Sequence, residues 1–78
     1  MRKSVRNIYL IKDLSYKSGC PVATLKFYLR LGLLQEIGRS PSTNFRYFDD
    51  SNIMTIRKIR SLQAKHYSLK EIQKELVG

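Results

Sequence analysis

The sequence predicts a mainly α-helical domain with one small β-hairpin, in the order helix, helix, hairpin, helix, helix. In four segments the apolar residues recur at three- and four-residue spacing, the period of a helix with one buried face. A stretch dense in turn-forming residues separates the second segment from the third. The chain has 78 residues, of which 42% are hydrophobic, enough for one small domain with its own core.

A basic arm at residues 1–8 precedes the first helix, which we expect over residues 11–17. Ile11 and Leu14 have the spacing that places them together on its inward face. Gly19 follows, and glycine readily adopts the left-handed conformation that ends many helices. The first helix should therefore end in a short turn.

The second helix is expected over residues 21–31. Pro21 suits its first turn, because the φ angle of proline is already helical and its missing N–H is not needed there. Val22, Leu25 and Leu29 fall within one narrow arc and form the predicted core face. Two short helices joined by a glycine-containing turn make a helix-turn-helix.

A β-hairpin, or wing, is expected after the second helix. Two short runs of extended or aromatic character, residues 35–38 and 45–48, flank the turn-forming stretch at residues 39–44. Because an isolated two-stranded hairpin is barely stable in water, this one should pack against the helices.

Two more helices follow the hairpin. The third should begin at the cap candidate Asp49 and continue to about residue 65, and Ser68 and Glu71 have the spacing of a capping box for the fourth. Their expected inward residues are Ile53, Ile56, Ile59 and Leu62, then Leu69, Ile72 and Leu76. The arrangement over residues 9–78 is that of a winged helix-turn-helix domain.

The chain is strongly basic. Fifteen Lys and Arg residues against six Asp and Glu give a formal net charge of +9. Such an excess is usually tolerated for an anionic partner, and we rank nucleic acid ahead of a merely soluble basic domain. No apolar run approaches the ~18 residues of a transmembrane helix, and no apolar segment follows the charged N-terminus, so we expect a cytoplasmic, nucleoid-associated protein.

Residues that could carry catalysis or bind a metal are scarce. His66 is the only histidine and falls in an expected turn, and Cys20 is the only cysteine and suits a packing role. One Cys and one His cannot build a structural zinc site, and no glycine-rich phosphate loop is present. We therefore expect neither an enzyme nor a bound cofactor or metal.

Basic and aromatic residues occur together in the second helix and in the hairpin. So small a core cannot bury all of these rings, so we expect some to be exposed beside arginine, where a ring suits contact with sugar, base edge or thymine methyl. The residues concerned are Lys26, Phe27, Tyr28 and Arg30 in the helix, with Arg39, Phe45, Arg46, Tyr47 and Phe48 in the hairpin.

Three motifs resemble the DNA-binding domain of the mercury-resistance regulator (MerR) family of bacterial transcription factors. The stretch "IKDLSYKSGCPVATLKFYLRLGLL" resembles that family's opening helix-turn-helix, "NFRYF" its wing signature, and "HYSLKEI" its last turn and fourth helix. The resemblance covers about residues 9–76. Asn44 and His66 stand where the family usually has glycine, and both residue types tolerate positive φ.

The resemblance implies sequence-specific binding of double-stranded DNA, with the second helix in the major groove and the wing on the backbone. It assigns helix contacts to Thr24, Lys26, Phe27 and Tyr28, and wing contacts to Arg46. Phe45 and Phe48 take the positions of wing tyrosines, where only packing contacts remain. The basic pattern adds Arg30 and Arg57 as expected phosphate contacts.

The resemblance also implies RNA polymerase as an indirect partner of a full-length regulator. Because family members continue into a long helix that pairs two subunits, we expect this chain to be monomeric alone and dimeric where such a C-terminal helix exists. Two alternatives remain open. One is an architectural or excisionase-like DNA-binding accessory protein, and the other is a basic RNA- or protein-interaction module.

Overall fold

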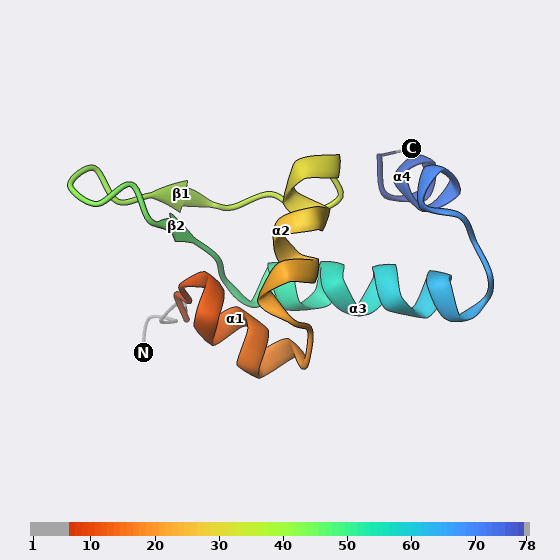
Figure 1. The fold of residues 1–78 in the computed structure, drawn as a ribbon, viewed down its shortest axis with the longest axis horizontal. Helices are drawn as coiled ribbons and strands as arrows, with labels where there is room; N and C mark the ends of the chain where they lie inside the picture. The colour runs from red at the N-terminus through yellow and green to blue at the C-terminus, as the bar shows by residue number, and fades with distance from the viewer. Residues whose placement is uncertain (1–6, 78) are drawn as a thin grey trace, which may run out of the picture.

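The computed structural model describes residues 7–77 and contains four helices and one hairpin among them (Figure 1). The elements are α1 (Ile11–Ser18), α2 (Val22–Leu31), β1 (Gly38–Arg39), β2 (Arg46–Tyr47), α3 (Asp50–Ala64) and α4 (Leu69–Val77). This order confirms the predicted mainly helical fold class. Most of the basic arm predicted at residues 1–8 lies outside the described residues.

The helix ends follow the local signals in the sequence. Gly19 caps α1 in the left-handed conformation, at φ 71°, and its N–H donates to the Ser15 carbonyl at 2.9 Å. The capping box of α4 is formed as expected, because the Glu71 N–H donates to Ser68 Oγ at 3.1 Å. In return, the Ser68 N–H donates to Glu71 Oε1 at 2.8 Å.

Two residues other than glycine have a left-handed backbone, as expected, among those the structure describes. Asn44, in the hairpin loop, has φ 64°, and His66, after α3, has φ 68°. The polar side chains of Asn and His tolerate this region better than branched or bulky apolar ones. His66 thus has a structural explanation.

The hairpin is shorter than predicted. β1 and β2 pair antiparallel over two residues each, with Gly38 opposite Tyr47 and Arg39 opposite Arg46. Phe48 leaves this ladder and pairs instead with Tyr9, through backbone hydrogen bonds of 2.7 and 2.8 Å. The segment before α1 therefore fixes the base of the hairpin, a long-range pairing that no local sequence pattern predicts.

The core lies where α1, α2 and α3 meet, and α4 closes one end of it (Figure 1). The side chains of Leu14, Leu25, Phe48, Ile56, Ile59 and Ile72 are all fully buried. α2 crosses α3, with the hairpin extending to one side of α2 and α4 lying on the other. None of the helices within residues 7–77 is long and apolar enough to cross a membrane.

Polar side chains of α3 and α4 fix the loops around α2. Arg60 Nη1 donates to the Gly19 carbonyl at 3.1 Å, which holds the turn between α1 and α2. The buried Asn52 donates from Nδ2 to the Gln35 carbonyl at 2.7 Å, before β1. Gln73 Nε2 donates to the Leu31 carbonyl at 2.9 Å. These bonds tie the segments at the two ends of α2 to α3 and α4.

Candidate nucleic-acid interface

The side chains of α2 divide into a buried face and an exposed face. Leu25 and Tyr28 are buried, while Lys26, Phe27 and Arg30 are exposed. Since side chains three or four residues apart share one face of a helix, Phe27 and Arg30 lie together. The Arg30 guanidinium lies over the Phe27 ring, 5.7 Å from its centroid. Basic and aromatic groups are therefore adjacent on the outside of α2.

A hollow of about 610 Å³ lies between α2 and the hairpin, and we call it the basic hollow. Lys26 and Arg30 line it from α2, and Arg39 and Arg46 from the two strands. The remaining lining residues are Leu29 and Glu36. Two basic residues that the sequence places on the second helix thus face two that it places on the hairpin.

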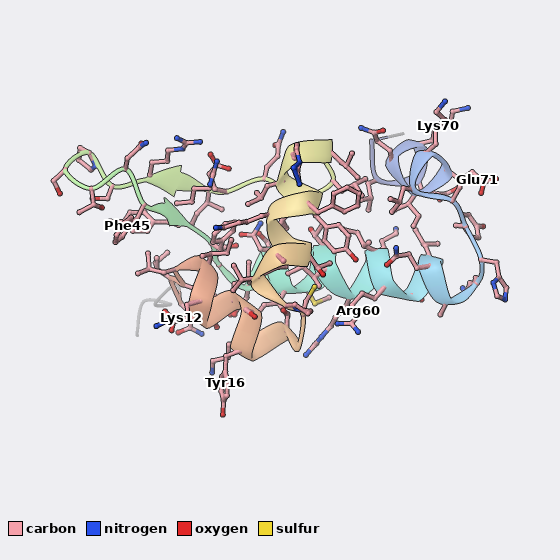
Figure 2. All side chains as sticks on the ribbon, in the orientation of Figure 1. Lys12, Tyr16, Phe45, Arg60, Lys70 and Glu71 are labelled. Carbon is pink, nitrogen blue, oxygen red and sulfur yellow. The ribbon has the colours of Figure 1, made fainter. Side chains whose placement is uncertain are left out.

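A second hollow, of about 470 Å³, lies between the start of α1 and the hairpin, and we call it the α1 hollow. Lys12 lines it from α1, Phe45 from the hairpin loop, and Lys26 and Arg46 belong to both hollows. Figure 2 shows Lys12 and Phe45 on these two elements. The remaining lining residues are Leu10, Ile11 and Asn44. The α1, α2 and hairpin surfaces therefore form one continuous basic region.

Lys12 is absent from the contacts that the sequence predicts. Its position on the outward face of an amphipathic helix is typical of a lysine that only meets water, and no local pattern marks it. It borders the α1 hollow where the pairing of Tyr9 with Phe48 joins the segment before α1 to the hairpin.

Glu36 is also absent from the predicted set, and it lies within the basic hollow. Arg39 Nε donates to Glu36 Oε2 at 3.0 Å, and Arg46 Nε lies 3.7 Å from Glu36 Oε1. A hydrogen bond from its own backbone N–H lowers the pKa of Glu36, and both arginines lower it further, against the opposing effect of burial. The carboxylate is therefore held in its charged form.

Phe27 also borders the opposite side of α2. A hollow of about 240 Å³ separates α2 from α4, and its lining residues are Phe27, Leu31, Leu33, Leu69, Lys70 and Gln73. The Phe27 ring is 39% exposed, against 58% for Phe45 in the hairpin loop. Exposed rings thus lie at two points of the surface, one on α2 and one on the hairpin.

Two predicted contacts lie in the core, which corrects the prediction for their side chains. Tyr28 is 3% exposed and Phe48 is fully buried. Tyr28 joins Leu25 on the buried face of α2, while Leu29 is half-buried against the core, as expected, and also lines the basic hollow. Phe48 turns inward where the chain leaves β2. The Tyr28 hydroxyl donates to Gln63 Oε1 at 3.0 Å, and burial raises its pKa.

The DNA contacts predicted for Thr24 and Arg57 stay predictions. Thr24 is half-buried on α2, and Arg57 is exposed on α3. Neither lines the basic hollow or the α1 hollow.

A metal or nucleophilic centre has no support in the part of the chain described. No group of three His, Cys, Asp or Glu side chains within residues 7–77 could hold a metal ion. Cys20 is buried, and this burial raises the pKa of its thiol, which disfavours the reactive thiolate.

The arrangement suits insertion of a helix into a DNA groove. An exposed face of the second helix of a helix-turn-helix can reach base edges, while basic side chains on flanking elements meet the phosphate backbone. Here α2 provides the face and the hairpin provides flanking arginines.

A family model described as "MerR HTH family regulatory protein" matches residues 9–77. Among solved structures, the lead(II) complex of the transcription regulator PbrR691 from Ralstonia metallidurans CH34 is 38% identical and has a TM-score of 0.80, covering 87% of this chain. HiNmlR, a MerR-family regulator lacking the sensor domain and bound to promoter DNA, is 28% identical, with a TM-score of 0.80 and coverage of 90%.

A MerR-family transcriptional regulator from Bacillus cereus has a TM-score of 0.83 over 92% of this chain at 21% identity, which shows the same fold. This chain spans 52% to 53% of the length of these three solved structures. No curated protein matches the chain.

Proposed function

The chain belongs to the MerR family of helix-turn-helix regulatory proteins and is a DNA-binding domain of that family; we propose that it binds DNA with α2 in the major groove and the hairpin on the adjacent backbone. The family consists of regulators and not of enzymes. The basic hollow carries this proposal. It sets two basic side chains of α2 opposite two hairpin arginines, within reach of one DNA surface.

The side chains divide into two roles in this proposal. Lys26 and Phe27 lie on the exposed face of α2, together with the half-buried Thr24, and come nearest the base edges. An exposed aromatic ring suits apolar contact with a thymine methyl group, and lysine suits the acceptor atoms of guanine. These residues would supply sequence preference.

The remaining basic residues hold phosphates. Arg30 and Arg46 line the basic hollow, and Lys12 lines the neighbouring α1 hollow. Phosphate contacts supply most of the affinity of a basic domain and set the register of the protein on the duplex. Arg57 has less support, since it lies outside both hollows.

For the whole protein we propose a transcriptional regulator that acts in the cytoplasm as a dimer on a pseudo-palindromic promoter. HiNmlR is a family member whose structure was solved bound to promoter DNA, which supports promoter DNA as the partner. This chain spans only 52% of the length of these two solved relatives, which leaves room for dimerisation outside the matched part. RNA polymerase would be affected indirectly, through the promoter.

An NMR titration of the labelled domain with mixed-sequence duplex DNA tests the proposal. We expect amide shifts concentrated in residues 24–30 and 39–46 and near Lys12, and these shifts should fade as salt rises because phosphate contacts release counterions. Shifts confined to other surfaces at low salt would contradict the proposed interface. Tighter binding to single-stranded RNA than to duplex DNA would support the RNA-binding alternative instead.

A further inference from the structure

Glu36 places a carboxylate in the surface that we propose for DNA. It lies between α2 and β1 and lines the basic hollow together with Lys26 and Arg30. A negative charge at this position repels the phosphates that its neighbours attract. Its presence in the hollow therefore opposes the binding that the surrounding residues favour.

Arg39 and Arg46, which face each other across the hairpin, give the carboxylate a role in the free protein. They are direct partners in the β1–β2 register, and like charges directly opposite each other destabilise a strand pair. Glu36 offsets this repulsion, because Oε2 accepts from Arg39 Nε at 3.0 Å while Oε1 lies 3.7 Å from Arg46 Nε. One carboxylate thus interacts electrostatically with two guanidinium groups.

The two arginines remain accessible in this state. The Arg39 side chain is 43% exposed and the Arg46 side chain 41%, whereas that of Glu36 is 25% exposed. Guanidinium groups bind carboxylate and phosphate through the same paired N–H donors. An anion that approaches from solvent can therefore reach both arginines and take the place of the carboxylate.

We propose that Glu36 occupies the position of a DNA phosphate between Arg39 and Arg46 in the free protein, and that the arginines exchange it for phosphate when DNA binds. The inference rests on the proposed function, and it adds Glu36 as a residue that limits the affinity for DNA. Exposed ion pairs of this kind are weak, so the exchange is reversible. Glu36 lowers the affinity of the domain for every duplex.

The exchange acts on phosphate contacts and not on base contacts. Competition from Glu36 weakens phosphate contacts on all sequences, whereas base contacts made by α2 are not affected directly. Affinity for specific and non-specific duplexes therefore falls by a similar factor, so the ratio between them is unchanged. Glu36 is a residue that sets the affinity of the domain for DNA, and it acts through the two hairpin arginines.

The test compares Glu36→Gln with wild type and with Glu75→Gln. Both substitutions raise the formal net charge by one unit from +9, but Glu75 is exposed on α4 and lines neither hollow. Fluorescence anisotropy with a mixed-sequence duplex over a series of NaCl concentrations measures affinity and its salt dependence. Thermal melts followed by circular dichroism check that each variant is folded, and Glu36→Ala is the second variant at this position.

Glu36→Gln should bind roughly fivefold more tightly than wild type at low salt, and the gain should shrink as salt rises, because salt also weakens the ion pairs that the wild-type protein must break. Glu75→Gln should change affinity by less than about twofold. In an Arg39→Ala/Arg46→Ala background the gain from Glu36→Gln should shrink to less than about twofold, the limit expected for the charge change alone, because its partners are absent.

Two results would overturn the inference. One is a Glu36→Gln protein that binds no more tightly than Glu75→Gln while wild type binds DNA. The other is a gain that persists without the two arginines, which would indicate simple repulsion. Failure of wild type to bind duplex DNA at low salt would instead refute the proposed function, and the inference with it.

Discussion

Tyr28 and Lys26 lie two residues apart on α2 and face different surroundings. Tyr28 is buried against α3, where its hydroxyl donates to Gln63 Oε1 at 3.0 Å, and Lys26 lines both the basic hollow and the α1 hollow. The family resemblance predicts a DNA contact for both residues. Because Tyr28 is buried, we interpret it as a residue that stabilises the fold instead.

The variant Tyr28→Phe separates these two roles. Removing the hydroxyl costs the hydrogen bond to Gln63, so the free energy of unfolding should fall by about 0.5–1.5 kcal/mol. For a domain of this size, each kcal/mol lowers the melting temperature by about 4–8 °C. DNA affinity should stay within about twofold of wild type, since the hydroxyl makes no phosphate contact in this interpretation.

The matched control is Tyr16→Phe, because the Tyr16 side chain is 87% exposed on α1 (Figure 2). Its melting temperature should equal that of wild type. A Tyr28→Phe protein with unchanged stability and weaker DNA binding would return Tyr28 to the set of DNA contacts.

At the scale of elements, the features that the sequence predicted correctly are helix ends and turns, which depend on a few neighbouring residues. Gly19, Asn44 and His66 adopt the left-handed conformations expected of them, and Ser68 and Glu71 form the expected capping box. Each of these features depends on a few neighbouring residues, so a short stretch of sequence contains the whole signal.

Features that depend on distant parts of the chain were not predicted. The bridge between Tyr9 and Phe48 joins segments 39 positions apart, and it ends the hairpin early and brings Lys12 into the α1 hollow. The ion pair of Glu36 with Arg46 likewise requires the hairpin, whereas its ion pair with Arg39 joins residues only three positions apart. Basic residues expected on the second helix and the hairpin do line one hollow, but its edges and its acidic residue Glu36 follow from tertiary structure, and DNA binding at this surface stays a prediction.

The capping box of α4 leads to a prediction for that element. Ser68→Ala removes the acceptor of the Glu71 N–H, and loss of such a cap costs about 1 kcal/mol. Because α4 contributes the fully buried Ile72 to the core, the loss should lower the melting temperature of the whole domain by about 4–8 °C. Ser61→Ala, at an exposed position in the last turn of α3, should leave stability unchanged or slightly higher, since alanine favours helix. Equal melting temperatures for the two variants would contradict a role for the cap.

At the scale of the molecule, the net charge of +9 acts on folding and on binding with opposite signs. The domain measures 40 × 32 × 24 Å, so many of its like charges are further apart than the screening length of physiological salt, about 8 Å. In dilute buffer these charges still repel one another and destabilise the compact state. The same charges attract DNA, and salt weakens both effects.

We therefore expect the melting temperature of the free domain to rise when NaCl increases from about 50 to about 150 mM, while DNA affinity falls. The rise follows because the Debye length shortens from about 14 Å to about 8 Å and screens self-repulsion. If Lys12, Arg30, Arg39 and Arg46 neutralise about four phosphates, affinity should fall about fiftyfold over the same interval. Thermal melts and anisotropy titrations in identical buffers measure the two responses. A melting temperature that falls with salt would show that local ion pairs, such as those of Glu36, outweigh the net repulsion in the free domain.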